Sequence, residues 1–223
     1  MKNQQGGFTL VEIAIVLVII GLLLGGVLKG QELINSAKVK NFATDFRNIP
    51  LYIYGYQDKF KALPGDDLNV AVRLAGATQA TTPGNLQGNG VINGDWNTPT
   101  VTDESMLFWQ HVRLAGLATG STVVAANNTY WPTNADGGRI GIEGGSANFI
   151  QNTDGVTFLQ GAYVICSEGI LGKFAKQLDT TMDDGNTATG SMRVVALAHA
   201  RGSQALANAN VQDATSYIVC MGL

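Results

Sequence analysis

The feature that most restricts what this chain can fold into is an apolar run near its N-terminus, from Phe8 to Leu28. Its 21 residues include one charged side chain, Glu12, and the others are apolar, Gly or Thr. As a helix rising about 1.5 Å per residue, the run covers roughly 30 Å, the hydrocarbon thickness of a bilayer. The sequence therefore predicts a helix that can span a membrane.

Two ordinary explanations of this run fit poorly. A secretory signal peptide has an apolar core of roughly 7–15 residues and a small-x-small cleavage site, whereas this run is longer and no such site follows it. A plain single-pass anchor leaves Glu12 unexplained. A carboxylate inside a spanning helix costs on the order of 3 kcal/mol of insertion free energy unless a partner neutralises it. We therefore expect Glu12 to have a function.

A cut between Gly7 and Phe8 would provide such a partner. Phe8 would gain a free amine, and Glu12 would lie four residues further along the new chain. In a filament, a neighbouring copy could place its amine against Glu12 in an apolar core. A charge pair in such surroundings depends strongly on distance and fixes the register between copies.

These residues also carry a resemblance to a known family. The short polar leader, Gly7, the sequence Phe8-Thr9-Leu10-Val11-Glu12 and the apolar run resemble the class III signal of prepilins. Type IV pilins and type II secretion pseudopilins share this signal. The resemblance implies cleavage after Gly7 by a prepilin peptidase and N-methylation of Phe8. It also implies assembly with other copies and other pilin-like subunits, on an inner-membrane assembly platform.

Composition argues against several other functions. Charged residues make up 14% of the chain, Gly occurs 28 times, and the net charge is −3. This balance is typical of a loop-rich secreted domain and provides no broad basic surface for nucleic acid. The sequence has no G-x-S-x-G element, no phosphate-binding Gly loop and no Cys/His cluster with zinc spacing. We expect neither an enzyme nor a nucleic-acid-binding protein.

Beyond Lys29 the helical pattern becomes amphipathic. Large apolar residues recur at alternating spacings of four and three, which predicts one buried face of a single long helix. They are Phe42, Phe46, Ile49, Ile53, Tyr56, Phe60 and Leu63. A coiled coil is the alternative, but the short, aromatic-rich stripe favours packing against a sheet. Pro50 is expected to kink the helix, and the turn at 63–67 to end it.

The rest of the chain predicts a β-rich head with one or two short helices, so the fold class is α+β, with an antiparallel sheet. A helix is expected to open at Thr102–Glu104, with Thr102 or Asp103 as its cap, and to end at Gly120. Other short helices are expected at 68–74 and 170–178, and strands at 139–143, 156–168, 191–199 and 217–221. The predicted boundaries are leader 1–7, membrane or filament-core helix 8–28, amphipathic continuation 29–63 and head 64–223.

The two cysteines, Cys166 and Cys220, lie in segments of similar pattern, 162–166 and 216–220. If these segments are neighbours in one sheet, the sulfurs can meet. A disulfide is then expected, because the head should lie outside the cytoplasm. Two free buried thiols are the alternative.

Two loops contain oxygen side chains of the kind that bind calcium. Asn89, Asn93 and Asp95 alternate in the first, but with a single carboxylate a plain Asx-turn loop is favoured. The better calcium candidate is the densest acidic stretch, which contains Asp179, Asp183 and Asp184 followed by Asn186. A solvated acidic turn is its alternative, and no other cofactor is predicted.

Two functions from different classes account for these features. A structural subunit of a type IV pilus or type II secretion pseudopilus explains the leader, Glu12, the long helix and the head together. It would first reside in the inner membrane with its head in the periplasm. A single-pass periplasmic binding or adhesion module explains residues 29–223 equally well, but not Gly7–Phe8 or Glu12. The filament subunit is favoured, and a major or a minor subunit fits the motif.

Overall fold

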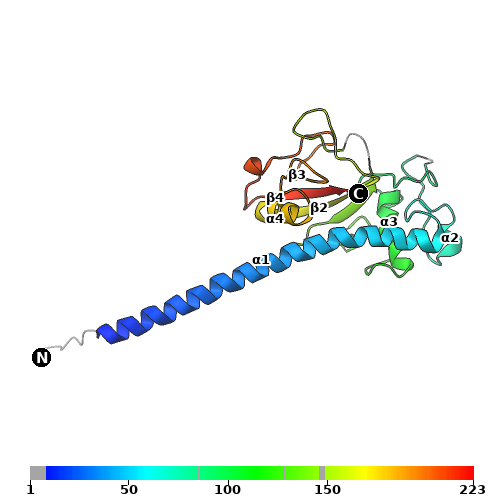
Figure 1. The fold of residues 1–223 in the computed structure, drawn as a ribbon. Helices are drawn as coiled ribbons and strands as arrows, with labels where there is room; N and C mark the ends of the chain where they lie inside the picture. The colour runs from blue at the N-terminus through cyan, green and yellow to red at the C-terminus, as the bar shows by residue number, and fades with distance from the viewer. Residues whose placement is uncertain (1–8, 85, 128, 146–148) are drawn as a thin grey trace, which may run out of the picture. The chain divides into compact units, whose positions relative to one another are not determined.

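The computed structural model describes residues 9–84, 86–127, 129–145 and 149–223. The chain divides into two compact units, an N-terminal unit that ends at Lys38 and a C-terminal unit, Val39–Leu223. The predicted α+β class is confirmed. In chain order (Figure 1) the elements are α1 (Leu10–Phe60), α2 (Val70–Arg73), α3 (Glu104–Leu114), β1 (Ile140–Gly144), β2 (Tyr163–Leu171), α4 (Gly172–Met182), β3 (Met192–Ala196), the 3-10 helix η1 (Asn208–Asn210) and β4 (Ser216–Gly222).

Helix α1 has a different surface in each unit. In the N-terminal unit its large apolar side chains are exposed, and the helix is long and apolar enough to cross a membrane. In the C-terminal unit one face is buried, as the stripe of large apolar residues predicts. The buried residues are Val39, Phe42, Ala43, Phe46, Ile49, Ile53 and Tyr56. Pro50 lies inside α1, which continues to Phe60 and ends three residues before the expected turn.

Four antiparallel strands form one sheet in the order β1-β2-β4-β3. All four expected strands are present, but two are shorter than expected. β2 begins at Tyr163 because residues just before it pair elsewhere: Leu159 N–H donates to the carbonyl of Ile150, and Phe158 bridges to Gln151. β3 ends at Ala196, where the His199 N–H donates back to the Ala196 carbonyl and closes a turn.

Helix α3 begins where it was expected, with Asp103 at the N-cap position, but it ends earlier than expected. It ends at Leu114, not at Gly120, because Gly116 takes a φ of +77° and the Leu117 N–H donates to the Val112 carbonyl. This left-handed residue closes the helix in the way that Gly commonly does. Asp103 occupies the N-cap position, but its side chain does not cap the helix. Its Oδ2 instead accepts a hydrogen bond from Thr98 Oγ1 at 2.5 Å.

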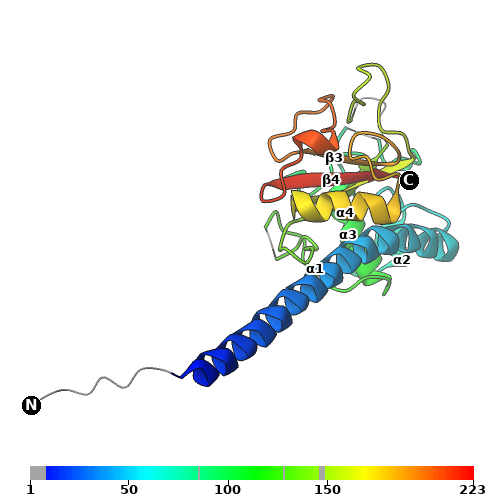
Figure 2. The ribbon, with the colours of Figure 1, turned by 60° about the vertical axis from the view of Figure 1, so that its left-hand side comes forward.

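The sheet separates two hydrophobic clusters, because alternate side chains of a strand point to opposite faces. Ile165 of β2 and Val219 of β4 join the cluster that contains the buried face of α1, together with residues of α3 and α4. Figure 2 shows α4 beside β4, and the rings of Phe42 and Phe174 lie 6.1 Å apart between α1 and α4. The opposite face is covered by loop residues, including Trp96, Phe149 and Leu159. The stripe on α1 therefore packs on a sheet, as expected.

The buried stripe predicts that substitutions on the two faces of α1 differ greatly in how much they destabilise the C-terminal unit. Phe46 is 1% exposed and Leu51 is 63% exposed. Phe46→Ala should destabilise the C-terminal unit by about 3–5 kcal/mol and lower its Tm by roughly 10 °C. Leu51→Ala should change stability by no more than about 0.5 kcal/mol. Thermal melts of the full chain in detergent, followed by near-UV circular dichroism, measure both; equal losses would contradict this packing.

Candidate functional site

The first turn of α1 holds Glu12 in a reciprocal hydrogen-bond arrangement with Thr9. Glu12 Oε2 accepts from the backbone N–H and from the hydroxyl of Thr9, both at 2.8 Å. The N–H of Glu12 donates to Thr9 Oγ1 at 3.3 Å. This pattern is a capping box, which satisfies donors at the start of a helix. Both hydrogen bonds to the carboxylate end on Oε2, so Oε1 can accept a hydrogen bond from a donor on another chain.

The surface around Glu12 is apolar and exposed. The large apolar side chains from Leu10 to Leu28 are between 46% and 90% exposed. Polar residues return at Lys29 and Glu32, which form an ion pair of 2.7 Å on the helix surface. An apolar surface of this length requires lipid or other protein chains around it. The two predicted processing residues, Gly7 and Phe8, lie outside the described residues.

Glycines on this part of α1 leave room for a second helix. Nothing lies within 4 Å of the position that a Cβ would take at Gly21, Gly25, Gly26 or Gly30. They form two small-xxx-small pairs, a spacing that permits helices to approach closely in membranes. The apolar run at the start of α1 thus combines an exposed surface with one carboxylate, Glu12, and the glycines in and just after it leave room for close packing.

Comparison with known proteins agrees with this geometry. Residues 2–28 match the prokaryotic N-terminal methylation motif, the signature of type IV pilins and pseudopilins. The chain therefore carries the N-terminal signature of pilin-like proteins, which implies processing by a prepilin peptidase and assembly with other pilin-like subunits. No significant match was found among curated proteins or solved structures.

The two cysteines form the expected disulfide. Cys166 of β2 lies directly opposite Cys220 of β4, with their Cα atoms 4.1 Å apart and their sulfurs 2.08 Å apart. Both residues are fully buried on the face of the sheet that loops cover. The bond links residues 54 positions apart in sequence and joins the two central strands of the sheet.

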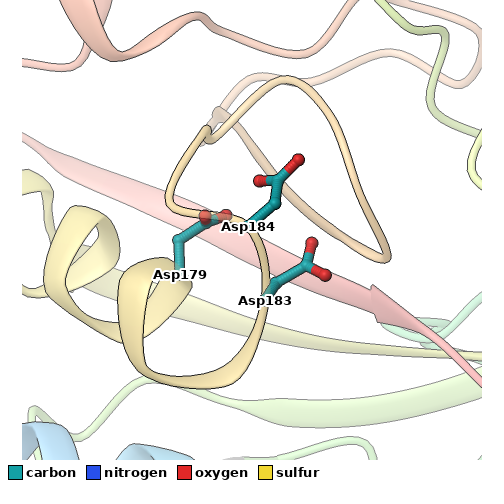
Figure 3. Close-up of side chains that lie close together, drawn as sticks. All are labelled: Asp179, Asp183 and Asp184. Atoms are coloured by element: carbon teal, nitrogen blue, oxygen red, sulfur yellow. The ribbon is translucent and has the colours of Figure 1, made fainter.

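The structure brings the three predicted calcium ligands together. Asp179 lies in the last turn of α4, and Asp183 and Asp184 follow directly after it (Figure 3). One oxygen of each carboxylate lies within 4.8 Å of the other two. We call these three residues the acidic cluster.

The first candidate loop has hydrogen bonds of its own. Asn89 Oδ1 accepts from the Val91 N–H at 2.8 Å, which is an Asx turn, and from Asn93 Nδ2 at 3.2 Å. Asp95 forms an ion pair of 2.6 Å with Arg201. The expected Asx-turn loop is confirmed.

Two buried polar residues of α3 have structural roles. His111 is fully buried, and both ring nitrogens are satisfied: Nδ1 accepts from the Gly65 N–H, and Nε2 bonds the Thr78 carbonyl. Glu104 is also fully buried, and its Oε2 accepts from the backbone and the side chain of Asn93. Its Oε1 has no hydrogen-bond partner. The sequence predicted Glu104 only as an acid near a helix start, because its burial results from tertiary packing.

Burial raises the pKa of Glu104 to about 7, although the bonds from Asn93 favour the charged form. A pKa above that of the unfolded chain means that stability is greatest at acidic pH and falls as the pH rises through about 7. Glu104→Gln removes this charge and retains an oxygen for Asn93. At pH 8 the variant should melt roughly 2–6 °C above the parent chain, because an unpaired buried group costs about 1–2 kcal/mol.

The difference should shrink as the pH falls from about 7 and disappear by about pH 4, below the ordinary pKa of glutamate, where the carboxyl is protonated in both the folded and the unfolded chain. Thermal melts of the full chain at both pH values provide the measurement. Glu32→Gln, at an exposed carboxylate of α1, should leave the pH dependence of Tm unchanged. A Glu104→Gln chain that melts below its parent at pH 8 would show that the buried charge is favourable.

Proposed function

We propose that this chain is a structural subunit of a type IV pilus or a type II secretion pseudopilus. It is synthesised as a precursor, cleaved between Gly7 and Phe8, and methylated at the new N-terminus. The observation that carries the proposal is the methylation motif over residues 2–28, on a helix whose exposed apolar run includes Glu12 as its one charged side chain.

Before assembly, the apolar run holds the precursor in the inner membrane. Lys2 then lies on the cytoplasmic side and the head in the periplasm, because positive charge favours the cytoplasmic side of a span. The Thr9 capping box supports this stage: two donors on the carboxylate lower the cost of placing Glu12 at the membrane.

In the filament, the exposed helices of many copies bundle together. Burying their apolar surface is worth roughly 25 cal/mol per Å² against water, but much less against lipid, which is itself apolar. Extraction from the membrane therefore requires an external motor at the assembly platform. The Glu12 carboxylate pairs with the N-terminal amine of Phe8 in a neighbouring copy. This charge pair fixes the register between copies and adds little affinity.

The disulfide suits a unit that remains outside the cytoplasm. A membrane-anchored periplasmic binding module would use the same C-terminal unit. It would have no need of a carboxylate in the first turn of its anchor, and Glu12 therefore favours the filament subunit.

Replacement of Gly7 tests processing. Gly7→Val should abolish cleavage and leave a precursor seven residues longer than the processed chain, in cells that contain a prepilin peptidase. The larger species is resolved on a gel and by intact mass. Gly6→Val, one residue further from the junction, is the matched control and should be cleaved. Normal processing of Gly7→Val would contradict the assigned junction.

Replacement of Glu12 tests assembly. Glu12→Leu should insert and be processed normally, since leucine is favourable in a membrane, but its recovery in sheared filaments should fall at least about tenfold, the equivalent of 1.4 kcal/mol. Immunoblots of membrane and filament fractions measure both quantities. Glu32→Leu, beyond the apolar run, should retain incorporation. Filaments with the parental content of the Glu12→Leu subunit would overturn the register mechanism.

A further inference from the structure

A cavity of about 630 Å³ lies where the end of α1 meets the segment that follows it, and we call it the α1-end cavity. Gln57 and Lys61 line it from α1, and residues of the segment 62–73, which includes α2 (Figure 1), line it from the side. The turn 88–90 and Tyr163 at the start of β2 complete its walls. Small-molecule sites in proteins have volumes of about 300–1,000 Å³, so this cavity has room for a ligand.

Asp66 holds one wall of the cavity in place. It is buried, and its carboxylate accepts from three consecutive backbone N–H groups: Oδ1 from Gly88 and from Asn89 at 3.2 Å, and Oδ2 from Gly90 at 2.8 Å. Leu68 lies over the same turn, because a Cβ at Gly88 would come within 2.5 Å of Leu68 Cδ1. These contacts set the position of this wall before any ligand binds.

Asp67 fixes a second wall. It is also buried, and its Oδ2 accepts from the Tyr56 hydroxyl at 3.0 Å. Its Oδ1 accepts from the Asn69 N–H at 2.9 Å and from Arg73 Nη1 at 2.7 Å. Both aspartates therefore shape the cavity by holding other parts of the chain. A site whose walls are fixed beforehand loses little conformational entropy when a ligand binds.

Several polar side chains of the cavity remain available to a ligand. Gln57, Asn69 and Tyr163 line it, and none of their side chains forms a hydrogen bond with another of the described residues. Arg73 uses Nη1 for Asp67, and its Nε and Nη2 have no partner in the described part of the chain. The cavity therefore offers amide, hydroxyl and guanidinium groups that between them both donate and accept hydrogen bonds.

The charges that line the cavity cancel. Asp66 and Asp67 carry two negative charges, and Lys61 and Arg73 carry two positive charges. An anion would meet two carboxylates, and a cation would meet an ammonium and a guanidinium group. Neither sign of charge therefore has a clear electrostatic advantage, and the cavity suits a neutral, polar ligand.

We propose that the α1-end cavity binds a neutral saccharide, one or two sugar residues in size. Sugar hydroxyls both donate and accept hydrogen bonds, which matches the free groups of Gln57, Asn69 and Arg73. The C–H face of a sugar ring is apolar and suits the negative face of an aromatic ring, which Tyr163 provides, and the side chain of Leu68. Every lining residue belongs to the C-terminal unit, so the proposal does not depend on filament assembly.

The test is isothermal titration calorimetry of the full chain in an amine-oxide detergent, which has no sugar head group. The probes are three neutral disaccharides: lactose, cellobiose and N,N′-diacetylchitobiose. Glucuronic acid and glucosamine, which carry one charge each, are the comparison. At least one neutral disaccharide should bind with a stoichiometry of one, and more tightly than either charged sugar. Binding by none of the three, or binding of a charged sugar that is equally tight or tighter, would overturn the proposal.

Two substitutions locate the ligand. Gln57→Ala and Asn69→Ala remove amides that make no hydrogen bond within the described chain, so each should leave Tm unchanged. Each should weaken saccharide binding about 3- to 10-fold, the equivalent of one lost hydrogen bond. Gln31→Ala, at an exposed glutamine of α1 outside the cavity, is the matched control and should bind as the parent chain does. Parental affinity in both Gln57→Ala and Asn69→Ala would place the saccharide elsewhere and refute this site.

Discussion

A single carboxylate, Glu12, in the exposed apolar run at the start of α1 is the constraint on which this account depends. Glu12 is costly in a membrane and of no use in a simple anchor, and the chain positions it in a capping box with Thr9 at the start of α1. The same run matches the N-terminal methylation motif. An apolar helix by itself specifies only a place in lipid, whereas an apolar helix with one placed charge can specify a register between copies.

The C-terminal unit obtains its stability from different sources. Its sheet is covered on one face by α1, α3 and α4 and on the other by loops, so both faces of the strands are buried. The Cys166–Cys220 bond joins the two central strands between these layers. A disulfide suits a domain outside the cytoplasm.

Features that the sequence predicted well depend on neighbours in the chain. The stripe from Phe42 to Tyr56 has helical spacing, and the acidic cluster combines a spacing of four with an adjacent residue at a helix end. Features that it missed depend on distant partners. β2 begins late because Phe158 and Leu159 pair with the segment at Ile150 and Gln151. The end of α3 is a local exception: Gly116 already takes a positive φ and closes the helix four residues before Gly120. The burial of Glu104 and Asp179 likewise arises from packing that no local pattern reveals.

The most direct test of the central claim is the mass of the N-terminal peptide of the chain isolated from filament fractions of its own cells. The account predicts a chain that begins at Phe8 and carries one additional methyl group on its amine. An intact chain that begins at Met1 and remains in the membrane, in cells with an active prepilin peptidase, would contradict it.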